Sequence, residues 1–125
     1  MQFILSPAKT IDLNATCPDG MESLPDFSNQ AIFLMSKLKN IDQSRLKKLM
    51  KLSEKLSKTV WDWHQNWECS EAVDKALRAG ARPCAFAMQG EAFKFLGLPT
   101  LKNSDIEFAQ SHLLIISGLY GLLRP

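Results

Sequence analysis

Three short apolar segments, far apart in the chain, constrain the fold more than any other feature of this sequence. They span residues 3–5, 84–88 and 113–116. Proline, glycine or polar residues bound each segment, and that combination of length and borders is typical of buried strands. Residues 113–116 could instead continue the helix expected before them, but the pair of isoleucines and Gly118 favour a strand. The stretches between them carry helical patterns, so the sequence predicts an α/β fold with mixed helices around a small central sheet.

Capping residues mark the predicted helices between these strands. A serine stands at four expected helix starts: Ser28, Ser53, Ser70 and Ser104. Glu107 follows Ser104 at the spacing of a capping box, which favours a helix there. Asn40 and Asp42 indicate a break before a basic second helix, and Gly80 ends the short helix expected from residue 71. Residues 91–96 form another short predicted helix, whereas residues 12–26 hold prolines, a glycine and acids and are expected to be irregular.

The composition excludes several classes of protein. With 125 residues, 46% of them hydrophobic and 22% charged, the chain can form one core and is not an intrinsically disordered protein. No apolar run approaches the roughly 20 residues that span a bilayer, so we expect a cytoplasmic protein with no membrane segment. Cys17, Cys69 and Cys84 are widely spaced, which fits reduced, structural thiols. No Cys-x-x-Cys pair is present and His64 lies far from His112, so the sequence predicts neither a metal site nor a cofactor.

Positive charge is concentrated in one segment. The formal net charge of the chain is +2, yet residues 37–58 carry eight basic and two acidic residues, or +6, which leaves −4 for the remainder. The basic residues are Lys37, Lys39, Arg45, Lys47, Lys48, Lys51, Lys55 and Lys58. In one continuous helix four lysines would form a stripe suited to a polyanion: Lys47, Lys51, Lys55 and Lys58. The positions expected to face inward are Leu46, Leu49, Leu52 or Ser53, Leu56 and Val60. A helix that starts after Ser53 would split this stripe, and an ordinary solvated helix face is the alternative interpretation.

Lys9 and Thr10 follow the first predicted strand, a place where α/β sheets commonly bind ligands. The segment from Ser6 to Thr10 has no glycine and is therefore not a phosphate-binding loop of the Walker type. A cation and a hydroxyl in a restricted turn can hold a small anion, and Asp12 is available for proton transfer. An enzyme of unknown reaction is accordingly one hypothesis, and an exposed lysine in a turn is the alternative.

An aromatic cluster lies at the end of the third predicted helix. Helical spacing puts Val60, Trp63, His64 and Trp67 on one face, which predicts core packing for them. Trp61 is then the better candidate for an exposed ring that could stack on a base.

Two glycines near the end of the chain form a last candidate site. If Gly118 and Gly121 open a helix, their backbone amides can approach a phosphate, and Arg124 can add a charge-assisted contact. Helix-hairpin-helix modules hold a DNA backbone in this way. A glycine-rich turn that packs closely on the sheet is the alternative.

Taken together, these segments resemble the YaaA family of bacterial peroxide-stress proteins. The resemblance rests on residues 3–12, on Phe108-Ala109-Gln110 with His112-Leu113, and on residues 116–125. Members of that family are about twice as long, so the resemblance implies that residues 1–125 are the N-terminal part of one larger YaaA-like domain. Such a half chain would expose apolar surface and could self-associate.

The resemblance also implies a function. It indicates a cytosolic protein that limits oxidative damage by lowering intracellular free iron under hydrogen peroxide stress, and a DNA-binding protein with a positively charged cleft and a helix-hairpin-helix-like element. The hypothesis of DNA binding assigns phosphate contacts to Lys9, Thr10, Lys47, Lys48, Lys51, Lys55, Gly118, Tyr120, Gly121 and Arg124. Contacts of this kind direct binding to the DNA backbone and make it depend steeply on salt.

Overall fold

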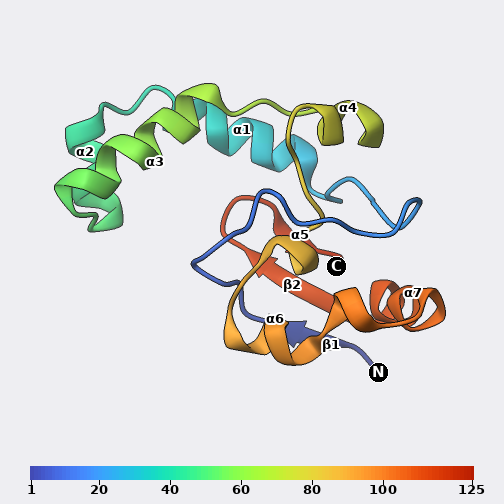
Figure 1. The fold of residues 1–125 in the computed structure, drawn as a ribbon. Helices are drawn as coiled ribbons and strands as arrows, with labels where there is room; N and C mark the ends of the chain where they lie inside the picture. Colours follow the sequence, from blue (N-terminus) through green and yellow to red (C-terminus); the bar gives the residue numbers. More distant parts are fainter. The chain divides into compact units, whose positions relative to one another are not determined.

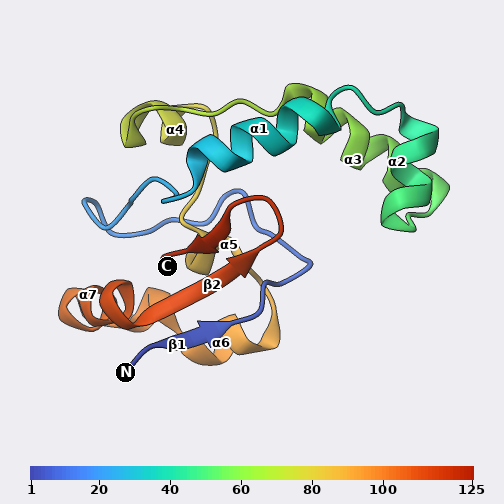
Figure 2. The same ribbon diagram turned by 180° about the vertical axis from the view of Figure 1, so that it is seen from behind.

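The computed structural model describes residues 1–125 and confirms the α/β class (Figures 1 and 2). In chain order the elements are β1 (Phe3–Leu5), α1 (Ser28–Leu38), α2 (Gln43–Met50), α3 (Glu54–Asn66), α4 (Val73–Arg78), α5 (Cys84–Ala87), α6 (Glu91–Leu96), the 3-10 helix η1 (Leu98–Thr100), α7 (Asn103–His112), β2 (Leu113–Ser117) and β3 (Gly121–Leu123). The chain divides into two compact units. Unit 1 is Met1–Phe27 with Ser70–Pro125, and unit 2 is Ser28–Cys69. None of the helices is long and apolar enough to cross a membrane.

The three strands form one mixed sheet in unit 1, in the order β1-β2-β3. β1 lies parallel to β2, with Phe3 opposite Leu113, and β2 runs antiparallel to β3, with Ser117 opposite Gly121. Since β1 and β2 are parallel, the loops that follow them leave the sheet at the same edge.

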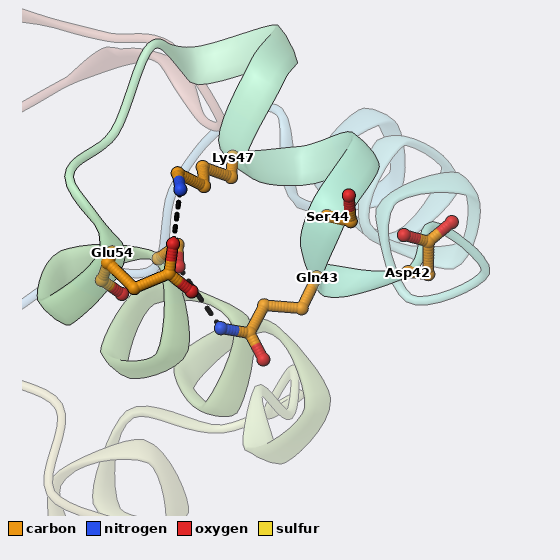
Figure 3. Close-up of a pocket in the computed structure, with 6 residues that line it drawn as sticks. Asp42, Gln43, Ser44, Lys47 and Glu54 are labelled. Atoms are coloured by element: carbon orange, nitrogen blue, oxygen red, sulfur yellow. Dashed lines mark hydrogen bonds and ion pairs between the residues drawn. The ribbon is translucent and has the colours of Figure 1, made fainter.

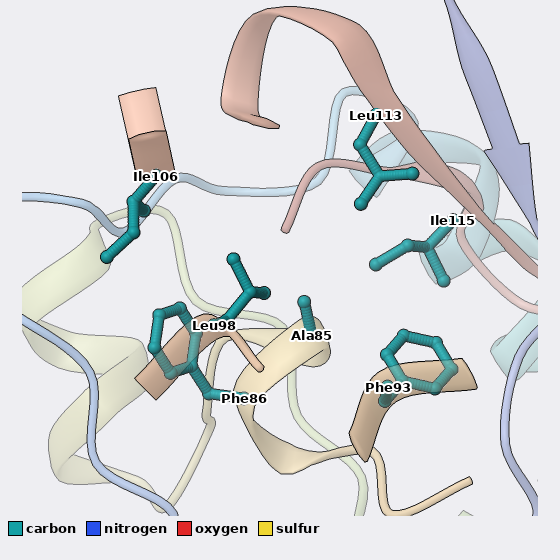
Figure 4. Close-up of a cluster of buried hydrophobic side chains, with 7 residues drawn as sticks. All are labelled: Ala85, Phe86, Phe93, Leu98, Ile106, Leu113 and Ile115. Atoms are coloured by element: carbon teal, nitrogen blue, oxygen red, sulfur yellow. The ribbon is translucent and has the colours of Figure 1, made fainter. Parts of the chain in front are cut away.

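One face of β2 supplies the centre of the core of unit 1 (Figure 4). The side chains of Leu113 and Ile115 both lie on that face, because residues two apart in a strand point to the same side of the sheet. They belong to a cluster of buried side chains that also contains Ala85, Phe86, Phe93, Leu98 and Ile106. Ile106, on α7, and Ile115 are fully buried, so α7 and the sheet share this core.

The predicted strand at residues 84–88 is wrong, because residues 84–87 form the short helix α5. The amide N–H of Ala87 donates to the carbonyl of Pro83 at 3.0 Å, which is a helical hydrogen bond. Only Met88 pairs as a strand residue would, in an isolated antiparallel bridge with Ile11. A short apolar run that is buried on all sides has no periodicity that separates helix from strand.

Two of the predicted helix caps are also wrong. α7 begins at Asn103 with Lys102 as its N-cap, and no side chain caps it, so Ser104 and Glu107 do not form a capping box. α4 begins at Val73 rather than directly after Ser70, again without a side-chain cap. Both helices exist nevertheless.

Unit 2 contains the predicted break and the predicted Ser53 cap. The Asp42 carboxylate accepts from the amide of Arg45 at 2.9 Å, and the Ser53 hydroxyl accepts from the amide of Leu56 at 3.3 Å. Lys51, with φ 53°, ends α2 in the left-handed conformation. The lysine stripe is therefore divided between α2 and α3. Of the inward positions expected for one continuous helix, Leu46 and Val60 are buried as predicted, whereas the prediction is wrong for Leu49 and Leu56, which are exposed.

A buried serine sets the inward face of α3. Ser57 is fully buried, and its hydroxyl donates to the carbonyl of Glu54 at 2.7 Å and accepts from the Gln43 amide at 3.0 Å, which ties α2 to α3. Trp61 is half-buried and its indole N–H donates to the carbonyl of Ile41 at 3.2 Å. Trp63 is 63% exposed. The sequence prediction for these two tryptophans is thus reversed, because it followed the apolar residues and left out the buried polar Ser57.

Candidate functional site

The parallel pairing of β1 and β2 gathers part of the predicted site at one edge of the sheet in unit 1. Lys9 and Thr10 lie in the loop after β1, and Gly118 and Tyr120 lie in the turn after β2. Sequence reasoning named these residues separately. The structure brings them to the same edge, where ligands of α/β sheets are commonly bound.

Backbone contacts fix the loop after β1. The carbonyl of Thr10 accepts from the amide of Gln89 at 3.0 Å, and the amide of Asp12 donates to the carbonyl of Ala87 at 2.7 Å. Gly90 lies so close that a Cβ atom there would be 3.0 Å from the Cβ of Ala8. Lys9 is exposed, so its ammonium extends from a loop whose backbone is held on both sides.

Asp12 has a local structural role in the same loop. Its carboxylate accepts from the amide of Asn14 at 2.9 Å, which closes an Asx turn. The side chain is exposed, so it is open to a proton-transfer partner as well as to this hydrogen bond.

The turn after β2 is the centre of a β-hairpin. Residues 118–120 connect β2 to β3, and the hydroxyl of Ser117 accepts from the amide of Tyr120 at 3.1 Å. Gly121 has φ 72°, a conformation that commonly completes a three-residue hairpin turn. A helix does not open here, so the helix-hairpin-helix-like interpretation of these residues is wrong and the glycine-rich turn against the sheet is observed.

Arg124 is separated from the glycines of the turn. β3 runs antiparallel to β2, so Arg124 follows it at the opposite edge of the sheet from Gly118. Its guanidinium donates to the carbonyl of Gln110 at 2.7 Å, and its Nε lies 4.0 Å from the Asp26 carboxylate. These contacts hold the end of the chain against α7, whose last carbonyls attract a cation. The predicted shared phosphate site of Arg124 with Gly118 and Gly121 is therefore not formed.

The other predicted contacts lie in unit 2. Lys48, Lys51 and Lys55 are exposed and form no ion pair, whereas Lys47 is half-buried and paired with Glu54. Unit 2 carries eight basic and four acidic residues, which gives a net charge of +4. Unit 1 carries seven basic and nine acidic residues, which gives a net charge of −2. The positive charge of the chain is thus concentrated around the connection between α2 and α3.

A polar pocket of about 400 Å³ opens beside the ion pair of Lys47 (Figure 3). It is lined by Asp42, Gln43, Ser44, Lys47, Glu54 and Ser57. Two carboxylates line it and Glu54 neutralises Lys47, so its charge does not favour an anion.

Two of the three thiols are held in their protonated form. Burial is the main cause that raises the pKa of Cys17 to about 11, and the neighbouring Glu22 carboxylate adds to it. Burial likewise raises the pKa of Cys84 to about 11, and its thiol donates to the carbonyl of Arg124 at 3.1 Å. A protonated thiol is a poor nucleophile and a poor target for peroxide, so these two cysteines serve the structure.

The motifs at both ends of the chain, now seen as the loop after β1 and the hairpin after β2, match a known family. A family model described as "Peroxide stress protein YaaA" covers residues 1–125. The chain belongs to the YaaA family of peroxide stress proteins. This confirms the resemblance drawn from residues 3–12, 108–113 and 116–125.

Relatives of this YaaA-family chain in several bacteria carry the name UPF0246 protein. The identity is 37% over 125 residues with the protein of Francisella tularensis subsp. novicida, 41% over 128 residues with that of Clostridium beijerinckii, and 35% over 125 residues with that of a Marinomonas species. Each alignment covers all of this chain but only 48%, 45% and 46% of the respective relative. The chain thus spans about half the length of the relatives it matches.

Two features of this YaaA-family chain escaped sequence reasoning. The close approach of Gly90 to Ala8 joins segments about 80 residues apart, and a lone glycine after an apolar run was its only sequence signal. The exposure of Trp63 follows from the buried Ser57, and no pattern of apolar residues reveals it.

Proposed function

We propose that the protein acts in the response to peroxide stress by binding the phosphate backbone of DNA through the lysines of unit 2. The observation that carries this proposal is the set of exposed lysines without ion pairs around the α2–α3 connection: Lys48, Lys51 and Lys55. Lysine side chains at such positions displace the counterions of DNA without recognising a sequence. Lys47 contributes less, because Glu54 already neutralises it.

The resemblance to the YaaA family supplies the cellular outcome in this proposal. The DNA-bound protein limits oxidative damage, and intracellular free iron falls under hydrogen peroxide stress. The proposal accordingly links two measurements on the same variant, DNA affinity in vitro and free iron in peroxide-treated cells.

The test is a titration of duplex DNA with the full-length protein and with a variant that combines Lys48→Ala, Lys51→Ala and Lys55→Ala. We expect the variant to bind at least about tenfold more weakly at low salt, because three phosphate contacts are lost. Cells that carry it should survive peroxide less well and keep more free iron.

A matched control removes the same charge from unit 1, through Lys75→Ala, Lys94→Ala and Lys102→Ala, all at exposed positions. This control should bind DNA as the wild type does. Equal losses in the two variants would show that only total charge matters and would contradict the proposal. A wild-type protein that binds no DNA at low salt would also contradict it.

A second candidate function rests on the edge of the sheet in unit 1. Lys9, Thr10 and the Gly118–Tyr120 turn share that edge, where an enzyme of unknown reaction could hold a small anionic substrate, with Asp12 for proton transfer. For this function Lys9→Ala should abolish peroxide survival and leave DNA affinity unchanged. Normal survival of the Lys9→Ala strain would exclude it.

A further inference from the structure

We propose that Trp63 is a stacking platform for an unpaired base of single-stranded DNA, beside the lysines of unit 2. This inference rests on the proposed DNA-binding function and adds the kind of DNA that the surface prefers. Trp63 is a residue for which the apolar pattern of the helix predicts core packing. The juxtaposition that carries it is an exposed indole on the same helix as exposed lysines.

Trp63 is free on the outer side of α3. Its side chain is 63% exposed, although tryptophan is among the more buried residue types on average. Trp61, two residues earlier, is half-buried and donates its indole N–H to the carbonyl of Ile41. Trp61 thus has a structural role in unit 2. Trp63 has no such role, because most of its ring makes no packing contact.

One exposed lysine lies on the same face of α3 as that ring. Lys55, Thr59 and Trp63 recur at intervals of four residues, so they lie on one helix face, and all three are exposed. Lys55 and Trp63 are separated by about 12 Å along the helix axis, a distance that a few nucleotides of a single strand span. Lys58 is also exposed and forms no ion pair, but it stands five residues before Trp63 and so lies on a different side of the helix.

This combination of groups fits single-stranded DNA. Proteins that bind single strands join a basic surface for the backbone to an aromatic ring on which a base stacks. In a regular duplex the bases are stacked on one another, so an indole that touches the outside of the duplex meets only sugar and phosphate. The lysines therefore serve both forms of DNA, and Trp63 serves only the unpaired one.

Leu56 is exposed on the same side of α3, which an apolar protein partner would also use. The charge on this face favours the nucleic acid, because the exposed Lys55 would lose hydration against an apolar surface. Asp62, the residue before Trp63, carries a half-buried carboxylate. Because it repels phosphate, Asp62→Asn should strengthen binding of single-stranded and duplex DNA alike.

The test compares a labelled thymidine oligonucleotide with a duplex of the same length, each titrated with the full-length protein. We expect Trp63→Ala to weaken binding of the single strand at least about fivefold, the lower end of measured base stacking on aromatic rings, and to change duplex affinity less than about twofold. Trp63→Phe should keep part of the affinity, since a phenyl ring also stacks. As a control, Phe95→Ala removes an aromatic ring that is 87% exposed in unit 1 and should change neither affinity.

Tryptophan fluorescence gives an independent readout. The oligonucleotide should quench the emission of the wild type, and it should not quench Trp63→Phe, although Trp61 and Trp67 are still present in that variant. Single-strand affinity of Trp63→Ala within about twofold of wild type would overturn the inference and leave the proposed function standing. Equal losses on single strand and duplex would also overturn it. A wild-type protein that binds neither DNA overturns both.

Discussion

Replacement of Gly121 by alanine tests whether the chain ends in a β-hairpin. Gly121 has φ 72°, a backbone conformation that costs an alanine about 1–2 kcal/mol. An added Cβ would also lie 3.3 Å from the ring of Phe27, which is closer than most such contacts. We therefore expect Gly121→Ala to lower the free energy of unfolding by about 1–2 kcal/mol, and the melting temperature by roughly 3–10 °C.

Gly118, in the same turn, supplies the matched control. Its φ lies outside the left-handed region, and nothing lies within 4 Å of the position of an added Cβ. Gly118→Ala should therefore be neutral, or stabilising by up to about 1 kcal/mol, because alanine restricts the unfolded chain. Thermal unfolding followed by far-UV circular dichroism measures both variants. If Gly121 opened a helix instead, alanine there would stabilise the protein by about 1 kcal/mol, so a rise in melting temperature for Gly121→Ala would refute the hairpin.

Three further predictions follow from burial and exposure. Burial lowers the pKa of His64 from its ordinary value of 6.5. The unfolded chain therefore takes up a proton at a higher pH than the folded protein does. The contribution of neutral His64 to the free energy of unfolding is complete above pH 6.5 and is lost as the pH falls towards the folded pKa. His64→Gln should flatten this decline in urea unfolding measured as a function of pH, and an unchanged decline would contradict the assignment. Since the pKa of Cys84 is raised to about 11, iodoacetamide at neutral pH should modify this thiol at least about tenfold more slowly in the folded protein than in urea. Equal modification rates in the folded protein and in urea would contradict this prediction. Ile4 is 65% exposed on the edge strand β1, so we expect the 125-residue chain to self-associate. In sedimentation equilibrium, Ile4→Lys should shift this chain towards monomer. A wild-type chain that is monomeric at high concentration would contradict the prediction.

The sequence predicts those parts of the fold that local signals determine. The strands predicted at residues 3–5 and 113–116 are present as β1 and β2, and Asp42 and Ser53 mark the break between α2 and α3 through hydrogen bonds to their own helices. The short strand β3 escaped prediction because it exists only through its pairing with β2, which no local pattern records.

The candidate site is less predictable, because its geometry depends on contacts between distant segments. The sequence identifies Lys9 and Thr10 by their place after a strand, but only the parallel pairing of β1 with β2 shows that their loop and the Gly118–Tyr120 turn follow strands at the same edge of the sheet. Arg124 was grouped with that turn by its closeness in sequence, and the antiparallel direction of β3 carries it to the other edge.

The salt dependence of duplex DNA binding tests the central claim most directly. The logarithm of the affinity falls with the logarithm of salt concentration by about 0.9 for each phosphate contact. Full-length protein that carries Lys48→Ala, Lys51→Ala and Lys55→Ala should therefore show a slope about 2 to 3 shallower than that of the wild type, while the unit 1 control variant keeps the wild-type slope. A wild-type affinity that is insensitive to salt, or identical slopes for all three proteins, would contradict the assignment of DNA binding to the lysines of unit 2.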